Sequence, residues 1–90
     1  MILVVTYELK QPVESYTPLF EALKNEESWA HYMSSTWLVA THQSPNSFGK
    51  SLVNLIFEGD RLLVTGFSPS YYGWLPQKAW DWIGRYKESD

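Results

Sequence analysis

The chain has 90 residues, enough for one domain with a small core. Apolar residues make up 44% of it and aromatic residues 17%, a composition that excludes a disordered chain. The net charge is −3, and the seven Lys and Arg residues are scattered singly, so the chain lacks the basic cluster that binding to a long nucleic acid requires.

The first expected element is a strand over residues 2–8, a run rich in β-branched residues. Alternation places its side chains on two opposite faces, with Leu3, Val5 and Tyr7 on one and Ile2, Val4, Thr6 and Glu8 on the other. Both faces are largely apolar, so we expect both to be covered.

A loop is expected over residues 10–15, because Pro12 disfavours helix at the residue before it. A helix should then run from residue 16 or 17 to about residue 27. Thr17 is the expected N-cap, with Pro18 at the first helical position. The i, i+3, i+4, i+7 spacing predicts one buried face, made of Tyr16, Leu19, Phe20 and Leu23.

The middle of the chain predicts a hairpin, a second helix and a fourth strand. The expected elements are a strand over 28–33, a tight turn or bulge at Ser34 and Ser35, a strand over 36–41, a helix from Ser44–Pro45 to about 57, a turn over 58–60 and a strand over 61–67. The second helix should bury Phe48, Leu52, Leu55 and Ile56.

The remaining residues differ from the rest of the chain in composition. An aromatic loop over 68–76 should lead into a short helix over 77–87 with Trp80, Ile83 and Tyr86 turned inward, and residues 88–90 should fray. No cysteine is present, so disulfides are excluded, and no apolar run approaches the roughly 20 residues needed to cross a bilayer. With no signal-peptide pattern at the start, we expect a cytoplasmic protein.

This order predicts an α+β fold: a single ferredoxin-like βαββαβ domain over 1–90, with both central helices on one face of an antiparallel sheet and a helical tail over 68–90. The first and third strands should be central. The opposite face would then leave several apolar side chains in water, which monomers rarely tolerate. A homodimer packed through this open face is the first expectation, and a tail folded across the face of its own chain is the second.

Two strand motifs carry a family resemblance. The segments Val4-Val5-Thr6-Tyr7-Glu8-Leu9 and Trp29-Ala30-His31-Tyr32-Met33-Ser34-Ser35-Thr36-Trp37-Leu38-Val39 resemble short bacterial and phage proteins known as SinR-family, relatives of the small CRISPR-adaptation subunit (Cas two) and of the VapD toxins. The resemblance covers roughly residues 1–67. It implies homodimers of a ferredoxin-like protomer.

The resemblance also implies one catalytic hypothesis. In the nuclease-like relatives the first strand ends in tyrosine–aspartate, and the aspartates of two protomers are proposed to hold a divalent metal. The matching pair here is Tyr7-Glu8, and glutamate, one methylene longer, would hold a metal with a different geometry. Glu8 would be the ligand for Mg²⁺ or Mn²⁺ under this alternative. The other interpretation of Glu8 is a solvated strand end paired with Lys10.

Two other groups of residues suggest recognition. His31, Ser34, Ser35 and Thr36 could receive a phosphate or a ribose at a turn. Aromatic rings on a loop can stack on bases, at about 1–3 kcal/mol per base. The full set of expected ligand-binding residues is Tyr7, Lys10, His31, Ser34, Ser35, Thr36, Trp37, Arg61, Tyr71, Tyr72 and Trp74. Each group also has a purely structural interpretation. The serines of the turn could form hydrogen bonds with their own hairpin backbone, and the aromatic rings of the tail could pack against the sheet. These alternatives remain open.

The preferred hypothesis is a non-enzymatic, homodimeric binding module for a nucleotide-type small ligand, without a metal or cofactor. The small size of the chain and the family resemblance suggest a more specific hypothesis, a phage anti-defence protein that sequesters an immune signalling nucleotide. The alternatives are a Cas two-like metal-dependent nuclease and a protein-binding inhibitor or structural dimer.

Overall fold

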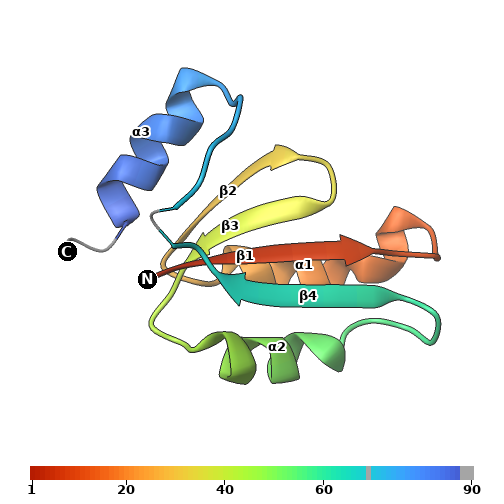
Figure 1. Ribbon diagram of the computed structural model, residues 1–90. Coiled ribbons are helices and arrows are strands. Elements are labelled where there is room, and N and C mark those ends of the chain that lie inside the picture. Colours follow the sequence, from red (N-terminus) through yellow and green to blue (C-terminus); the bar gives the residue numbers. More distant parts are fainter. Residues whose placement is uncertain (69, 88–90) are drawn as a thin grey trace.

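The computed structural model describes residues 1–68 and 70–87. This part of the chain forms an α+β fold with an open, four-stranded antiparallel sheet and three α-helices (Figure 1). In chain order the elements are β1 (Ile2–Glu8), the 3₁₀ helix η1 (Val13–Tyr16), α1 (Thr17–Lys24), β2 (Ser28–Met33), β3 (Thr36–Ala40), α2 (Pro45–Val53), β4 (Arg61–Gly66) and α3 (Gln77–Tyr86). The fraying expected for residues 88–90 lies outside the described residues.

The strand order is β2-β3-β1-β4, so the first and third strands are central, where the sequence places them. Val5 of β1 faces Trp37 of β3 on one side and Val64 of β4 on the other, and all pairings are antiparallel. The register of β2 against β3 shifts between Ala30 and Met33, next to the turn at Ser34 and Ser35. The turn-or-bulge prediction at this position is therefore confirmed.

The first helix begins at Thr17, within the predicted start, but its cap and its end differ from the prediction. Residues 13–15, expected in a loop, form η1 together with Tyr16, and the Ser15 N–H donates to the Pro12 carbonyl at 2.9 Å. Tyr16 then occupies the N-cap position of α1, and the Thr17 hydroxyl donates to the Glu14 carbonyl instead of capping the helix. The helix ends at Lys24 and not near residue 27. The Glu26 carboxylate there accepts a hydrogen bond from the Thr41 hydroxyl at 2.6 Å, which ties this stretch to the end of β3.

The second helix begins as predicted and ends early. Ser44 caps it, because its Oγ accepts a hydrogen bond from the Ser47 N–H at 3.1 Å. The helix stops at Val53, four residues before the predicted end, and the Leu55 N–H donates to the Leu52 carbonyl in a tighter turn. The remaining strand and tail helix ends lie within one residue of the prediction.

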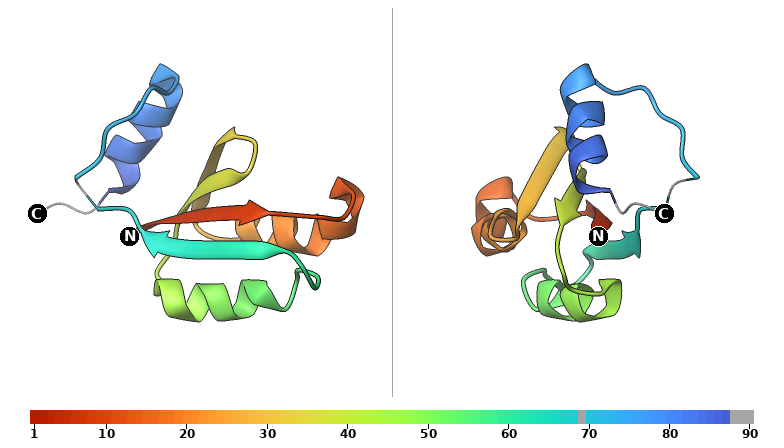
Figure 2. Two further views of the ribbon diagram at one scale, coloured as in Figure 1. Left: turned by 45° about the vertical axis from the view of Figure 1, so that its right-hand side comes forward. Right: turned by 90° about the vertical axis from the view of Figure 1, so that its left-hand side faces the viewer.

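The first face of the sheet carries α1 and α2 (Figure 2). Its core is continuous across β1, β3 and both helices, and its buried members are Leu3, Val5, Tyr16, Leu19, Leu23, Trp37, Val39, Phe48 and Leu52. The alternation predicted along β1 is confirmed here, since Leu3 and Val5 lie on this face and Ile2 lies on the other.

The second face carries α3, which lies on the side of the sheet opposite α1 and α2 (Figure 2). Its smaller core consists of Ile2, Ala30, Leu38, Ala40, Trp82 and Ile83. The Trp82 indole N–H also donates to the Ser28 hydroxyl at 2.9 Å, which fixes α3 against β2. The tail of the same chain thus buries much of the surface that led us to expect a dimer through this face.

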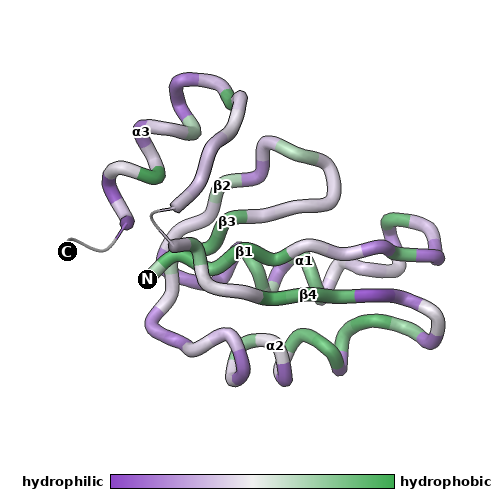
Figure 3. Tube along the Cα trace, viewed as in Figure 1, coloured by the Kyte–Doolittle hydropathy of each residue, from purple (hydrophilic) through white to green (hydrophobic). Residues whose placement is uncertain are grey.

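Apolar residues run along β1 and much of β4, as the colouring of Figure 3 shows. At β4 the cover by α3 stops, and Leu63 remains 59% exposed. No helix in the described residues has both the length and the apolar character needed to cross a membrane.

Candidate functional site

The structure distributes the predicted site residues over three places and does not bring them together in one pocket. Tyr7, His31, Ser34 and Trp37 line a pocket on the first face. Lys10, Arg61 and Glu8 meet at the far end of β1. Tyr71, Tyr72, Trp74 and Thr36 line a pocket on the second face. Within one chain the sheet separates the aromatic loop from the polar turn, so these predicted residues do not share one pocket.

The pocket on the first face, called the aromatic groove here, has a volume of about 260 Å³. It lies between α1 and the edge strand β2, and its lining residues are Tyr7, Val13, Phe20, Lys24, Trp29, His31, Ser34 and Trp37. Five of these eight carry a ring. This volume is slightly below the roughly 300–1,000 Å³ of typical ligand sites, which suits a single planar group.

The rings of the aromatic groove hold one another in place around Trp37. The His31 ring stacks on the Trp37 indole with centroids 4.0 Å apart and planes 15° apart, and Phe20 lies parallel to it at 6.1 Å. Trp29 lies against the same indole at 5.2 Å with a tilt of 46°. Trp37 lines the groove but is only 2% exposed, so it is the buried base on which the accessible rings rest.

Hydrogen bonds fix the polar atoms of the aromatic groove. The Trp37 Nε1–H donates to the Tyr7 hydroxyl at 2.9 Å, and that hydroxyl donates to the Ser34 carbonyl. The pKa of Tyr7 is raised by burial, partly offset by the Trp37 bond, so its phenol stays neutral. His31 Nε2 lies 3.2 Å from the same carbonyl, which can only accept, so Nε2 carries the hydrogen and Nδ1 is the acceptor nitrogen of the neutral ring.

Among the described residues that line the aromatic groove, Lys24 is the one Lys or Arg. Its ammonium lies 5.5 Å from the centroid of the Trp29 ring, a cation–π contact, and its side chain is exposed. Lys24, Trp29 and Phe20 all line the groove but are absent from the ligand-binding residues predicted from the sequence. The signal available was Phe20 and Lys24 at i, i+4 spacing, which places both side chains on one side of α1.

At the end of β1, Glu8 is exposed and lies between two cations. Its Oε1 is 3.8 Å from Lys10 Nζ and 3.6 Å from Arg61 Nε. A carboxylate that already has two cationic partners is a poor candidate for a metal ligand. Within residues 1–68 and 70–87, no three or more Asp, Glu or His side chains converge as metal ligands would.

The aromatic loop encloses a pocket of about 250 Å³ against the second face. Tyr71 stacks on Phe67 with centroids 4.5 Å apart, so it belongs to the packing of the tail. Tyr72 and Trp74 are 95% and 94% exposed. The Thr36 hydroxyl is within 3.0 Å of the Thr6 hydroxyl, and the Ser35 carbonyl accepts from the Tyr7 N–H, so this turn is occupied by its own chain.

Comparison with protein-family models, with curated proteins and with solved structures finds no match for this chain. The resemblance seen in the two strand motifs therefore remains a prediction. Function has to be argued from the aromatic groove and its neighbours.

Proposed function

We propose that this chain is a non-enzymatic binding module that holds a nucleotide-type ligand by its flat ring in the aromatic groove. The observation that carries the proposal is the gathering of Trp29, His31 and the buried Trp37 around one pocket with Lys24 at its rim. Aromatic rings bind any base through its π face, and this needs no extended basic surface. The net charge of −3 is compatible with such a ligand.

The polar groups of the aromatic groove suit the rest of a nucleotide. The Lys24 ammonium can meet one phosphate, and the Ser34 hydroxyl can donate to a phosphate oxygen. His31 Nδ1 is an acceptor when Nε2 donates to the Ser34 carbonyl, so it can accept a hydrogen bond from a sugar hydroxyl. A single cation favours one phosphate group over a polyphosphate or a nucleic-acid strand, whose binding grows with each phosphate neutralised. We therefore expect a mononucleotide or a cyclic nucleotide.

The wider assignment is part of the same proposal. The strand order β2-β3-β1-β4, with two helices on one face, supports a ferredoxin-like fold and with it the SinR-family resemblance. Under that assignment the protein is a cytoplasmic phage protein that sequesters a signalling nucleotide of host immunity. Sequestration needs tight binding without turnover, which suits a groove made of rings.

The test is the ligand-induced shift of the melting temperature across a panel of mono-, di- and cyclic nucleotides. Trp29→Ala should weaken binding by roughly 5- to 150-fold, equivalent to the 1–3 kcal/mol of one stacked base. Lys24→Ala should weaken binding of the nucleotide more than binding of the matching nucleoside. The matched controls are Trp74→Ala and Lys50→Ala, which remove an exposed indole and an exposed ammonium elsewhere.

Two results would count against this site. Loss of binding in Trp74→Ala but not in Trp29→Ala would place the ligand on the aromatic loop. No shift with any nucleotide would remove the proposed ligand class. The nuclease alternative has less support, because Glu8 is already paired with Lys10 and Arg61. Cleavage of RNA or DNA that needs Mg²⁺ or Mn²⁺ and disappears in Glu8→Ala would establish that alternative instead.

A further inference from the structure

The outer edge of β4 has backbone groups that pair with nothing in the described part of the chain. β4 is the last strand of the sheet, and β1 is its one strand partner in the described part of the chain. The Phe67 N–H donates to the Ile2 carbonyl at 3.0 Å, and alternation from this pair turns the backbones of Leu63 and Thr65 toward β1. The N–H and C=O groups of Leu62, Val64 and Gly66 therefore face outward.

This edge lacks the usual protection against pairing. Natural edge strands carry Lys, Pro, bulges or inward charges that block a second strand. From Leu62 to Gly66, β4 has no charged residue and no proline, and its register with β1 is regular. Leu63 is 59% exposed on it. The edge therefore has the character of a strand that accepts a partner.

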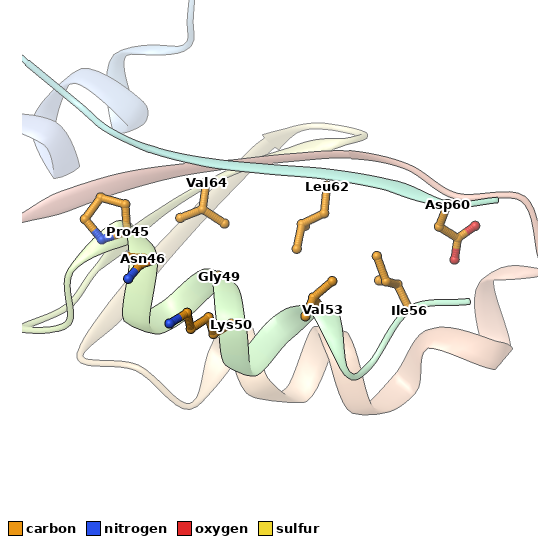
Figure 4. Close-up of a pocket in the computed structure, with 9 residues that line it drawn as sticks. All are labelled: Pro45, Asn46, Gly49, Lys50, Val53, Ile56, Asp60, Leu62 and Val64. Atoms are coloured by element: carbon orange, nitrogen blue, oxygen red, sulfur yellow. The ribbon is translucent and has the colours of Figure 1, made fainter. Parts of the chain in front are cut away.

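A groove runs beside the edge, between β4 and α2, with a volume of about 540 Å³. Figure 4 shows Leu62 and Val64 pointing from β4 toward α2, with Val53 and Ile56 rising from the opposite wall. Val53 is 52% exposed. A strand added to β4 would cover part of this apolar wall with every second side chain.

We infer that β4 pairs with β4 of a second copy of this chain, antiparallel and about a two-fold axis that passes between the two copies of Val64. In this register Val64 faces the partner's Val64, and Leu62 faces the partner's Gly66. All three outward-facing residues are then used, in three pairs that each exchange two hydrogen bonds.

The side chains favour this register and this partner. A Cβ placed on Gly66 would meet nothing within 4 Å, so the space beside it is open. The partner's Leu62 side chain fills that space, a cross-strand complement between a large residue and a glycine. Because of the two-fold symmetry, the Leu62–Gly66 pair occurs twice in the interface, once in each direction. An unrelated peptide would not supply both a leucine and a glycine at the matching positions. The aromatic groove lies beside β2, at the opposite edge of the sheet, and stays open in such a dimer.

Disulfide trapping tests the register directly, because the chain has no cysteine of its own. In Val64→Cys the two thiols belong to one hydrogen-bonded pair, with Cα atoms about 5.5 Å apart, within the range that a disulfide spans. In the control Leu63→Cys the thiol is more exposed, but the two copies of residue 63 lie diagonally, beyond that range. We expect Val64→Cys to form the covalent dimer at least about tenfold faster, and this advantage should vanish in denaturant.

Sedimentation equilibrium of the unmodified chain gives the second measurement, with a concentration-dependent dimer as the expected result. Gly66→Pro should shift it toward monomer, since the lost N–H faces outward and serves no bond within its own chain. Equal trapping rates for the two cysteine variants would overturn the proposal. So would a monomer at every concentration, including one that binds an extended peptide at this edge instead.

Discussion

At the scale of single residues, Asp60 links three parts of the chain that are distant in sequence. Its carboxylate accepts hydrogen bonds from the Lys10 N–H and the Tyr16 hydroxyl, each at 2.7 Å, and from the Phe57 N–H at 2.8 Å. Burial favours its neutral acid, but these three donors outweigh burial and lower the pKa of Asp60. The pKa of Tyr16 is raised by burial first and by the neighbouring carboxylate second.

Asp60→Asn should therefore lower the melting temperature at neutral pH, since an amide has a single acceptor oxygen for three donors. The folded pKa lies below the ordinary value of 3.8, so the stabilisation is present above that value and is lost as the pH falls through the lowered pKa. The difference in melting temperature between parent and variant should shrink as the pH falls below 3.8. Asp81→Asn, at an exposed position of α3, is the control, and a difference independent of pH would contradict this account.

At the scale of elements, the sequence was informative wherever local contacts decide the structure. The start of α2 was predictable because the Ser44 cap and Pro45 are adjacent in sequence. The end of α1 was not, because it depends on Glu26 meeting Thr41 across the fold. The aromatic groove was only partly predictable, because some of its residues are placed by local pattern and others by contacts across the fold. Alternation and the turn at Ser34 indicated Tyr7 and His31, whereas Lys24 enters only through the packing of α1 beside β2.

The difference between a real and an apparent cap can be measured. Ser44→Ala removes the acceptor for the Ser47 N–H and should cost about 1 kcal/mol of unfolding free energy, within a range of roughly 0.5–2. Thr17→Ala changes a residue that the sequence marks as a cap but whose hydroxyl serves as a donor to Glu14. Chemical denaturation should show a clearly smaller loss for Thr17→Ala, and equal losses would mean that Thr17 caps α1 in solution.

At the scale of the whole molecule, one sheet separates two cores of unequal size. The first-face core joins both central strands to α1 and α2, while the second-face core depends on a tail that follows β4. Apolar residues on both faces of β1 showed that each face would be covered, but periodicity does not identify the cover. The structure shows the tail as a cover of this face, because Trp82 and Ile83 share a core with Ile2 and Leu38.

Because the tail joins the sheet through so few side chains, we expect it to detach before the sheet unfolds. Trp82→Ala removes a buried indole and its hydrogen bond to Ser28, and the rest of α3 can leave the second face without disturbing the first-face core. Trypsin should then cut α3 at Lys78 and Arg85 much faster, while residues 1–67 resist cleavage. Trp74→Ala removes an indole that is 94% exposed and should leave the cleavage rate unchanged. Loss of the whole domain at once in Trp82→Ala would show instead that the two cores unfold as a single unit.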